Sequence, residues 1–270
     1  MQPVWEWFSS VLTIVRAEST FGHLIPATYG QKDFLKFIGD FLRFADTGIE
    51  SLQADSEPFR RELLLAKGLD SDELAKAEQR LQSLGPGSGL LITHGWVPMG
   101  IIRDEAKKLW LLHLKARHVK PDGSAVDFPL EWESEGTQRL IHLLPTLFQM
   151  KYGPTVLVVD ELDRRLHTLL TRKFIELAVN DPADDMRQLV FTTHDTNLLD
   201  SWLLRRDEIW FAQKNSGVTQ LTSLAEYKIR SDLDYEKAYL LGRFEGKPYF
   251  QYSPDDGGPH ANRVELEAVA

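Results

Sequence analysis

Two neighbouring carboxylates follow a short apolar segment of the sequence. Residues 155–159 read Thr-Val-Leu-Val-Val, and Asp160 and Glu161 come directly after them. A short, β-branched run of this kind is typical of a strand covered on both faces of a parallel sheet. Ligands bind at the carboxyl ends of such strands, and Mg²⁺ prefers oxygen ligands. Asp160 is therefore a candidate metal ligand and Glu161 a candidate for orienting a water molecule. The alternative is a strand that ends in a solvated acidic turn.

A histidine follows the next predicted strand. Residues 188–193 form a second buried-strand pattern, and His194 comes directly after it. A predicted helix over residues 166–179 separates the two strands, and a strand–helix–strand unit with short loops favours a parallel, right-handed crossover. His194 would then lie beside the carboxylates, where its ring could bond a phosphate oxygen or the attacking water. A capping or packing role is the alternative for a single histidine.

A third group of residues opens an amphipathic helix. Ser134, Gly136 and Thr137 precede a segment whose leucines recur on one helical side. Free N–H groups and the helix dipole make a helix start favourable for phosphate. The alternative is an ordinary helix start with Ser134 as N-cap.

The remaining sequence supplies the elements that would position these groups. Helical periodicity covers residues 4–15, 34–45 and 70–84. Strand patterns cover residues 109–119, 126–132, 208–213 and 218–224. We therefore predict a mainly helical region over residues 1–89, an α/β lobe over 90–230 that carries the candidate site, and a C-terminal helix with a loose tail over 231–270.

Composition excludes several classes of function. The 270 residues contain no cysteine, which rules out disulfides, thiolate zinc sites and cysteine nucleophiles. No apolar run approaches the ~20 residues of a membrane span, and the first eight residues do not form a secretory signal. With a net charge of −9, the chain lacks the broad basic surface of a protein that coats DNA. A cytoplasmic protein without membrane contact is expected, and contact with nucleic acid stays open.

The order of these groups resembles the ABC-type ATPase head of transporters and SMC-like proteins. More narrowly, it resembles the prokaryotic stand-alone AAA/ABC-like ATPases with SMC-type heads, over roughly residues 1–250. The matching stretches are residues 46–49, 133–140, 160–163 with 166–167, 192–195, 203–210 and 239–244. The resemblance implies an α/β, P-loop-NTPase-like fold, with a parallel sheet lobe, an inserted helical region and a β-hairpin. It also implies ATP and Mg²⁺ as cofactors and hydrolysis between two heads.

The resemblance assigns a role to each candidate residue. Ser134, Gly136 and Thr137 match the signature motif, which contacts the γ-phosphate of ATP held by a partner subunit. Asp160 matches the Walker B carboxylate that holds Mg²⁺, Glu161 the residue that polarises the attacking water, and His194 the switch histidine. The partner would be a second copy of the chain or a complete ATPase head. An effector protein and a role in phage defence are further implications of the family.

Two departures from the family pattern affect these expectations. Arg164-Arg165 stands where the family's dimer-facing loop has a small residue. The 270 residues also contain no phosphate-binding loop of the form G-x-x-x-x-G-K-[ST], whose amides and Lys meet the phosphates. The glycine-rich residues 85–89 lack that ending and read as a linker. The chain therefore resembles the C-terminal two-thirds of such an ATPase, and alone it is expected neither to bind ATP tightly nor to hydrolyse it.

Two other functions remain compatible with the sequence. One is a non-catalytic module that pairs with a complete head and donates only its signature motif. The other is a metal-dependent phosphoesterase, for which carboxylates and histidines suit Mn²⁺ or Mg²⁺. Its candidate residues are Asp160, Glu161, Asp163, His167 and His194. That reading leaves the segment from Ser134 to Thr137 without a role.

Overall fold

The computed structural model defines two compact parts of the chain. It describes residues 2–17, 32–66, 68–83, 89–94, 97–179, 187–230 and 233–246. The chain separates into unit 1, Met1–Asp195, and unit 2, Thr196–Ala270. The functional division at residues 89 and 230 stays a prediction, and the tail beyond residue 246 lies outside the described residues. Within them, no helix is long and apolar enough to span a membrane.

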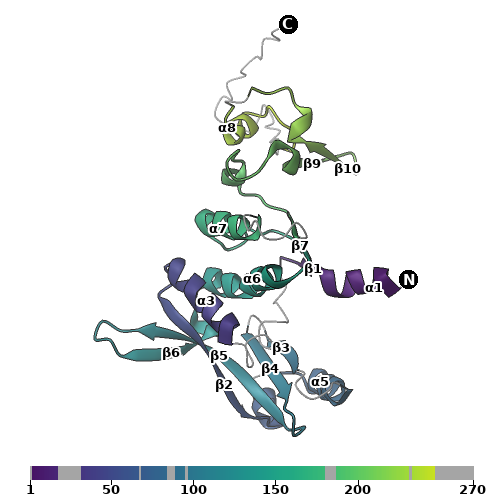
Figure 1. Cartoon of the computed structure of the whole chain (residues 1–270). Coiled ribbons are helices and arrows are strands. Elements are labelled where there is room, and N and C mark those ends of the chain that lie inside the picture. Colours follow the sequence, from purple (N-terminus) through teal and green to yellow (C-terminus); the bar gives the residue numbers. More distant parts are fainter. Residues whose placement is uncertain are drawn as a thin grey trace, which may run out of the picture. The chain divides into compact units, whose positions relative to one another are not determined.

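A three-stranded parallel sheet forms the part of unit 1 that carries the candidate site (Figure 1). Its strands lie in the order β1 (Leu12–Val15), β7 (Thr155–Val159) and β8 (Arg187–Phe191). The parallel pairing predicted for the last two strands is confirmed, with Val158 opposite Val190 and Val159 opposite Phe191. The inner face is buried, since Leu157 and Val159 are both 0% exposed.

Two helices supply much of the apolar packing of unit 1. They are α6 (Glu135–Tyr152) and α7 (Thr168–Val179). The α6 residues Leu140, Leu143 and Leu144 are each 0% exposed. Helix α3 (Lys32–Phe44) lies beside α6 (Figure 1), and the rings of Phe34 and Phe148 pack with centroids 4.9 Å apart. The apolar side predicted for residues 140–148 is thus the buried side of α6.

A five-stranded antiparallel sheet forms the rest of unit 1. The order is β2 (Ile49–Pro58), β5 (Leu109–Val119), β4 (Val97–Arg103) and β3 (Gly89–His94), and β6 (Ala125–Pro129) pairs with β5. The helices α4 (Arg61–Ala66) and α5 (Ser71–Ser83) bury leucines against this sheet. Asp70 caps α5, because its Oδ1 accepts hydrogen bonds from the backbone N–H groups of Asp72 and Glu73.

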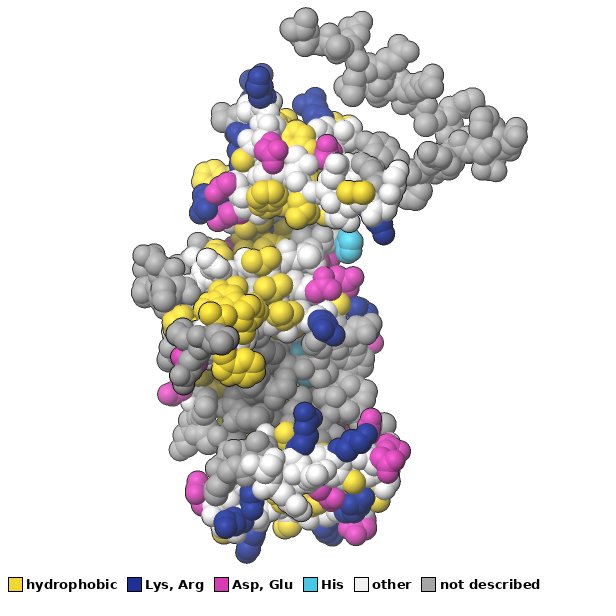
Figure 2. Space-filling model, turned by 90° about the vertical axis from the view of Figure 1, so that its right-hand side faces the viewer, with side chains coloured by type: hydrophobic (Ala, Val, Ile, Leu, Met, Phe, Trp, Pro, Cys, Tyr) yellow, Lys and Arg dark blue, Asp and Glu magenta, His cyan; other side chains and the backbone are white. Residues whose placement is uncertain are grey.

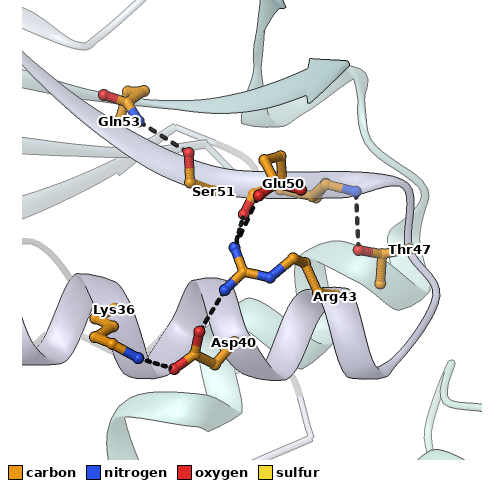
Figure 3. Close-up of polar contacts among 8 residues, drawn as sticks. Lys36, Asp40, Arg43, Thr47, Glu50, Ser51 and Gln53 are labelled. Atoms are coloured by element: carbon orange, nitrogen blue, oxygen red, sulfur yellow. Dashed lines mark hydrogen bonds and ion pairs between the residues drawn. The ribbon is translucent and has the colours of Figure 1, made fainter. Parts of the chain in front are cut away.

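The connection from α3 to β2 is a tight polar turn (Figure 3). The Thr47 hydroxyl donates to the Leu42 carbonyl at 3.0 Å and accepts from the Ile49 N–H at 3.3 Å. Gly48 has φ +78°, which glycine adopts without steric cost. Arg43 Nη1 donates to the Glu50 carbonyl at 2.7 Å. The family-matching stretch at residues 46–49 is therefore the closure between a helix and the long strand β2.

Hydrophobic side chains gather on the side of unit 1 from which α1 (Gln2–Glu6) extends in Figure 1, the side that Figure 2 faces. On α1 and the following π-helical turn, Trp7–Val11, Trp5 is 72% and Phe8 58% exposed. On the outer face of the parallel sheet, Ile14 is 60% and Val190 55% exposed. Parallel sheets are normally covered on both faces, so this exposed apolar face departs from the usual pattern.

Unit 2 contains the predicted hairpin and a short helix. Strands β9 (Trp210–Asn215) and β10 (Val218–Ser223) pair antiparallel around Ser216 and Gly217. Helix α8 (Tyr235–Leu240) begins at Asp234, whose side chain accepts from the Lys237 N–H. Aromatic rings fill the core of this unit, where Phe211 stacks on Tyr239 with centroids 5.5 Å apart. Within the described part of this unit, 3-10 turns also form at Thr196–Leu198, Arg206–Glu208 and Leu224–Glu226.

Three local predictions were wrong. Leu12 and Val15, assigned to a helix, lie in strand β1, because pairing with β7 outweighs their local helical periodicity. The predicted helical character of residues 1–89 is interrupted again by the unpredicted strand β2. The strand predicted over residues 126–132 ends at Pro129 and continues as the 3-10 turn Leu130–Trp132, since proline removes a backbone donor. The coarse class, α/β with a parallel sheet and a β-hairpin, is confirmed.

Candidate functional site

Asp160 and Glu161 lie at the carboxyl end of β7, next to the end of β8. The hydroxyl of Thr192 donates to Asp160 Oδ1 at 2.7 Å and accepts from the Glu161 N–H at 2.8 Å. The Asp160 N–H donates to the carbonyl of Val15, at the end of β1. All three parallel strands therefore converge on the pair of carboxylates, as strand ends in one parallel sheet must.

The residue that joins the two strand ends was missed by sequence reasoning. Thr192 was recognised only as part of the stretch Thr-Thr-His-Asp and received no role. The signal that could have identified it is a small hydroxyl residue one position beyond a strand that neighbours an acidic strand end. Short hydroxyl side chains at such places bond to nearby backbone groups, and Thr192 here bonds to both a backbone donor and a carboxylate.

His194 lies beside the loop that follows the carboxylates. Its backbone N–H donates to Asp163 Oδ1 at 3.3 Å, and its side chain is exposed. Asp195 in turn accepts from the Thr168 hydroxyl at the start of α7. The structure thus brings the His194 segment to the same sheet edge as Asp160 and Glu161, and the hydrogen bond that fixes His194 there is made by its backbone N–H.

The loop between β7 and α7 holds two residues in an uncommon backbone conformation. Glu161 has φ +49° and Arg165 has φ +64°, and such left-handed conformations cost non-glycine residues roughly 1–2 kcal/mol each. Arg164 Nη1 lies 3.2 Å from Glu161 Oε2. Strained residues persist where their surroundings over-determine them, and they cluster at functional sites.

Ser134 is the N-cap of α6. Its Oγ accepts from the Thr137 N–H at 3.1 Å and lies 2.8 Å from Thr137 Oγ1. Ser134 is exposed, and Gly136 and Thr137 are half-buried. The capping role named as the alternative is therefore present. The exposed position of this helix start is also the one that contact with a ligand or facing subunit would require.

The loop before α6 is held from behind by the antiparallel sheet. His118 on β5 lies with its Nε2 2.7 Å from Glu133 Oε1, and the Gln138 amide donates to the Glu133 carbonyl at 2.8 Å. A Cβ at Gly48 would lie 3.6 Å from His118 Nδ1. His118 therefore lies between the α3–β2 turn, where Ile49 pairs with it across β2 and β5, and Glu133, which directly precedes Ser134.

Comparison with known families identifies the domain to which these residues belong. Residues 27–200 match the AAA_21 family, described as "AAA domain, putative AbiEii toxin, Type IV TA system". The chain belongs to this AAA-domain family. The match covers more than half of the chain and includes every candidate site residue. No curated protein sequence matches the chain.

Membership of AAA_21 implies that this domain binds ATP, because the family is one of P-loop NTPases. Within the described residues, no group of three or more His, Cys, Asp or Glu side chains forms a metal cluster. A single exposed carboxylate such as Asp160 nevertheless suits Mg²⁺, which keeps several waters and takes further oxygens from nucleotide phosphates. The donor chemistry at this sheet edge therefore fits the magnesium that accompanies ATP.

The AAA_21 domain also shows why position 136 is glycine. A Cβ added to Gly136 would lie 2.6 Å from the backbone carbonyl oxygen of Arg165. Glu135 Oε2 lies 3.3 Å from Arg165 Nε, on the same side of the helix start. The first turn of α6 therefore packs closely against the backbone of the strained loop that follows Asp160.

Replacement of Gly136 by Ala is expected to destabilise the domain by about 1–3 kcal/mol, the usual cost of forced overpacking. The ordinary gain of roughly 1 kcal/mol from replacing a helical glycine is too small to offset a clash with backbone. Thermal unfolding checks the effect, at ~2–4 °C per kcal/mol for a domain near this size.

Gly153→Ala is the matched control for this experiment. Gly153 ends the same helix with φ 178°, and a Cβ there would meet nothing within 4 Å. It should leave the melting temperature unchanged within about 1 °C, because a surface change away from special features costs under ~0.5 kcal/mol. Equal melting temperatures for the two variants would contradict the close approach of α6 to the loop.

Proposed function

We propose that this AAA_21 domain is the lobe of an ABC-type ATPase head, of the kind found in SMC proteins, that carries the hydrolytic carboxylates. Asp160 would hold Mg²⁺, Glu161 would orient the attacking water, and His194 would contact the γ-phosphate. The observation that most supports the proposal is the Thr192 hydroxyl, bonded to Asp160 Oδ1 at 2.7 Å and to the Glu161 N–H at 2.8 Å. It links both acidic residues, at the end of β7, to the end of β8 that leads to His194.

The chemistry follows from placement and charge. Phosphoryl transfer needs the nucleophile in line and the charge on the phosphate oxygens neutralised, so catalysis is mostly positioning and electrostatics. Bound Mg²⁺ supplies part of that neutralisation. Asp160 would fix the ion's position on the sheet edge, while Glu161 accepts a hydrogen bond from water. The side chain of Glu161 is 38% exposed, so water can reach it.

Ser134, Gly136 and Thr137 would act on a second nucleotide. Their helix start is exposed and its backbone N–H groups suit an anion. We propose that they contact the γ-phosphate of ATP bound to a facing head, which is a second copy of the chain or a complete AAA_21 head. The family description supports a biological role in a toxin–antitoxin system. A role in phage defence beside an effector protein is a further part of the proposal and comes from the resemblance to ABC-like ATPases.

The 270 residues contain no G-x-x-x-x-G-K-[ST], and we propose that a separate segment of polypeptide supplies the phosphate-binding loop. Strand β8 is the last strand of the parallel sheet within the described residues, and edge strands offer unpaired backbone groups to a further strand. The exposed Val190 on β8 and Ile14 on β1 provide an apolar face for a covering helix. A strand–loop–helix segment has a physical place to bind here.

The test is a chimera, called here the loop-fused chain. The strand, phosphate loop and helix of a complete AAA_21 head are fused before Gln2, and release of phosphate from Mg-ATP is measured. We expect hydrolysis by the loop-fused chain and none by the 270 residues alone. A folded loop-fused chain that binds ATP but does not hydrolyse it, even as a dimer, would contradict the proposal.

A non-catalytic module is the second candidate, favoured by the same missing loop motif. In that role the chain would donate only its signature residues to a complete head. The mixing experiment uses an equimolar complete head whose own signature serine is changed to Arg, so that hydrolysis requires Ser134 of this chain. Activity in the mixture that disappears with Ser134→Arg, together with an inactive loop-fused chain, would favour this second function.

A further inference from the structure

Arg139 is a buried cation inside unit 1. It lies on α6, one turn after Glu135, and is 2% exposed. Within the described part of the chain, its Nε, Nη1 and Nη2 atoms have no hydrogen-bond partner. An isolated buried charge costs several kcal/mol unless an opposite charge compensates it. A guanidinium at this position therefore needs an electrostatic partner.

Among the described residues, the charged groups that affect the Arg139 guanidinium belong to the loop after β7. Burial lowers the pKa of the Arg139 guanidinium, nearby Arg164 and Arg165 lower this pKa further, and Glu161 raises it. Glu161 is the only acidic group in this set. Its Oε2 lies 3.2 Å from Arg164 Nη1, so Glu161 has one cation on its own loop and a second one behind it on α6.

The backbone of the loop needs outside support. Glu161 and Arg165 both have positive φ, and the first turn of α6 is in van der Waals contact with the loop through Gly136 and the Arg165 carbonyl. A strained conformation is maintained only by such surroundings. Arg139 lies on the same helix and interacts with the charged side chains of the loop, whereas Gly136 allows the backbone of the helix to pack closely against it.

We propose that Arg139 is a positioning residue for Glu161. Its buried charge attracts the Glu161 carboxylate and holds it at the sheet edge, in the strained conformation from which it would orient water. The inference rests on the proposed function for its catalytic meaning. The electrostatic pairing itself belongs to the folded chain and can be tested without ATP. Arg139 thereby connects the helix that carries Ser134 to Glu161 within one subunit.

A double-mutant cycle on the 270-residue chain tests the pairing through thermal unfolding. The variants are Glu161→Gln, Arg139→Met and the two combined. Glu161→Gln should lower the melting temperature by about 3 °C, since it leaves a buried cation without its counter-charge. In the Arg139→Met background the same change should shift it by less than about 1 °C, because coupled residues are non-additive. Equal shifts in both backgrounds would overturn the inference.

Two further variants keep the test decisive if Arg139→Met does not fold. Arg139→Lys retains the charge, so Glu161→Gln should still cost about 3 °C in that background. Glu135→Gln is the matched control, because Glu135 pairs with Arg165 on the surface and its side chain is 67% exposed. It should cost under about 1 °C, as exposed pairs contribute little. If Glu161→Gln costs no more than Glu135→Gln, the inference is wrong.

The kinetic consequence separates this inference from the proposed function. In the loop-fused chain, Arg139→Met should lower kcat about 10-fold with KM unchanged, and should add nothing to Glu161→Gln, because residues that act as a unit are non-additive. Hydrolysis that is insensitive to Arg139→Met would overturn the positioning role alone. Coupling in the melting experiment without any hydrolysis by the loop-fused chain would contradict the proposed function and leave the pairing intact.

Discussion

Replacing Glu161 by Gln is expected to slow ATP hydrolysis by the loop-fused chain at least about 100-fold, the low end for a positioned acid–base group. Gln keeps the size of the side chain and removes the carboxylate, which would accept a hydrogen bond from the attacking water. The Glu161 N–H bond to Thr192 Oγ1 is a backbone contact and is retained. Because ATP and Mg²⁺ would be held by other groups, the Kd of ATP should stay within about 3-fold. Single-turnover hydrolysis and equilibrium nucleotide binding measure the two effects.

Glu135→Gln controls for the loss of one carboxylate near the loop. Glu135 opens α6, pairs with Arg165 at 3.3 Å and is largely exposed, so its replacement should leave kcat within about 2-fold. A loop-fused Glu161→Gln variant that turns over as fast as the unchanged protein would remove Glu161 from the mechanism. Tenfold weaker ATP binding would instead assign Glu161 to the metal or nucleotide.

Asp160→Asn is expected to act on magnesium rather than on the water. The Mg²⁺ concentration for half-maximal ATP hydrolysis by the loop-fused chain should rise at least about 10-fold, since even residues that only orient a metal ligand contribute 10–100-fold to affinity. The Thr192 hydroxyl donates to Asp160 Oδ1 at 2.7 Å, and the Oδ1 of Asn can accept the same hydrogen bond. The fold should therefore survive, and the loss is one of charge. A magnesium titration at saturating ATP measures it.

Asp163→Asn is the matched control for magnesium. Asp163 lies on the same loop and its Oδ1 accepts from the His194 N–H at 3.3 Å, a bond that Asn can also accept. It should shift the magnesium midpoint by less than about 3-fold if Asp163 is not a ligand. Equal shifts for Asp160→Asn and Asp163→Asn would mean that the metal site is shared. No shift for Asp160→Asn would exclude this residue as the magnesium ligand.

The elements nearest the site could be predicted from local sequence. The run at residues 155–159 is short and β-branched, which predicts a strand of a parallel sheet, and the two acidic residues after it mark where that strand ends. The Ser134 cap and the hairpin around Ser216-Gly217 are equally local, because each depends on a few neighbouring residues. These predictions were confirmed because no distant part of the chain opposes them.

What the sequence by itself determined is the type of each strand, cap and charged group. Only the tertiary structure decided which of them meet. Leu12–Val15 forms a strand because β7 is available as a parallel partner. The stabilisation from that pairing depends on residues far along the chain, so local periodicity cannot predict it. Thr192 acquired its role because β8 lies beside β7, and Gly136 because α6 packs on the Arg165 carbonyl. Arg139 is buried for the same reason: its surroundings come from a loop more than twenty residues away, and burial and charge pairing depend on position in space rather than on sequence neighbours.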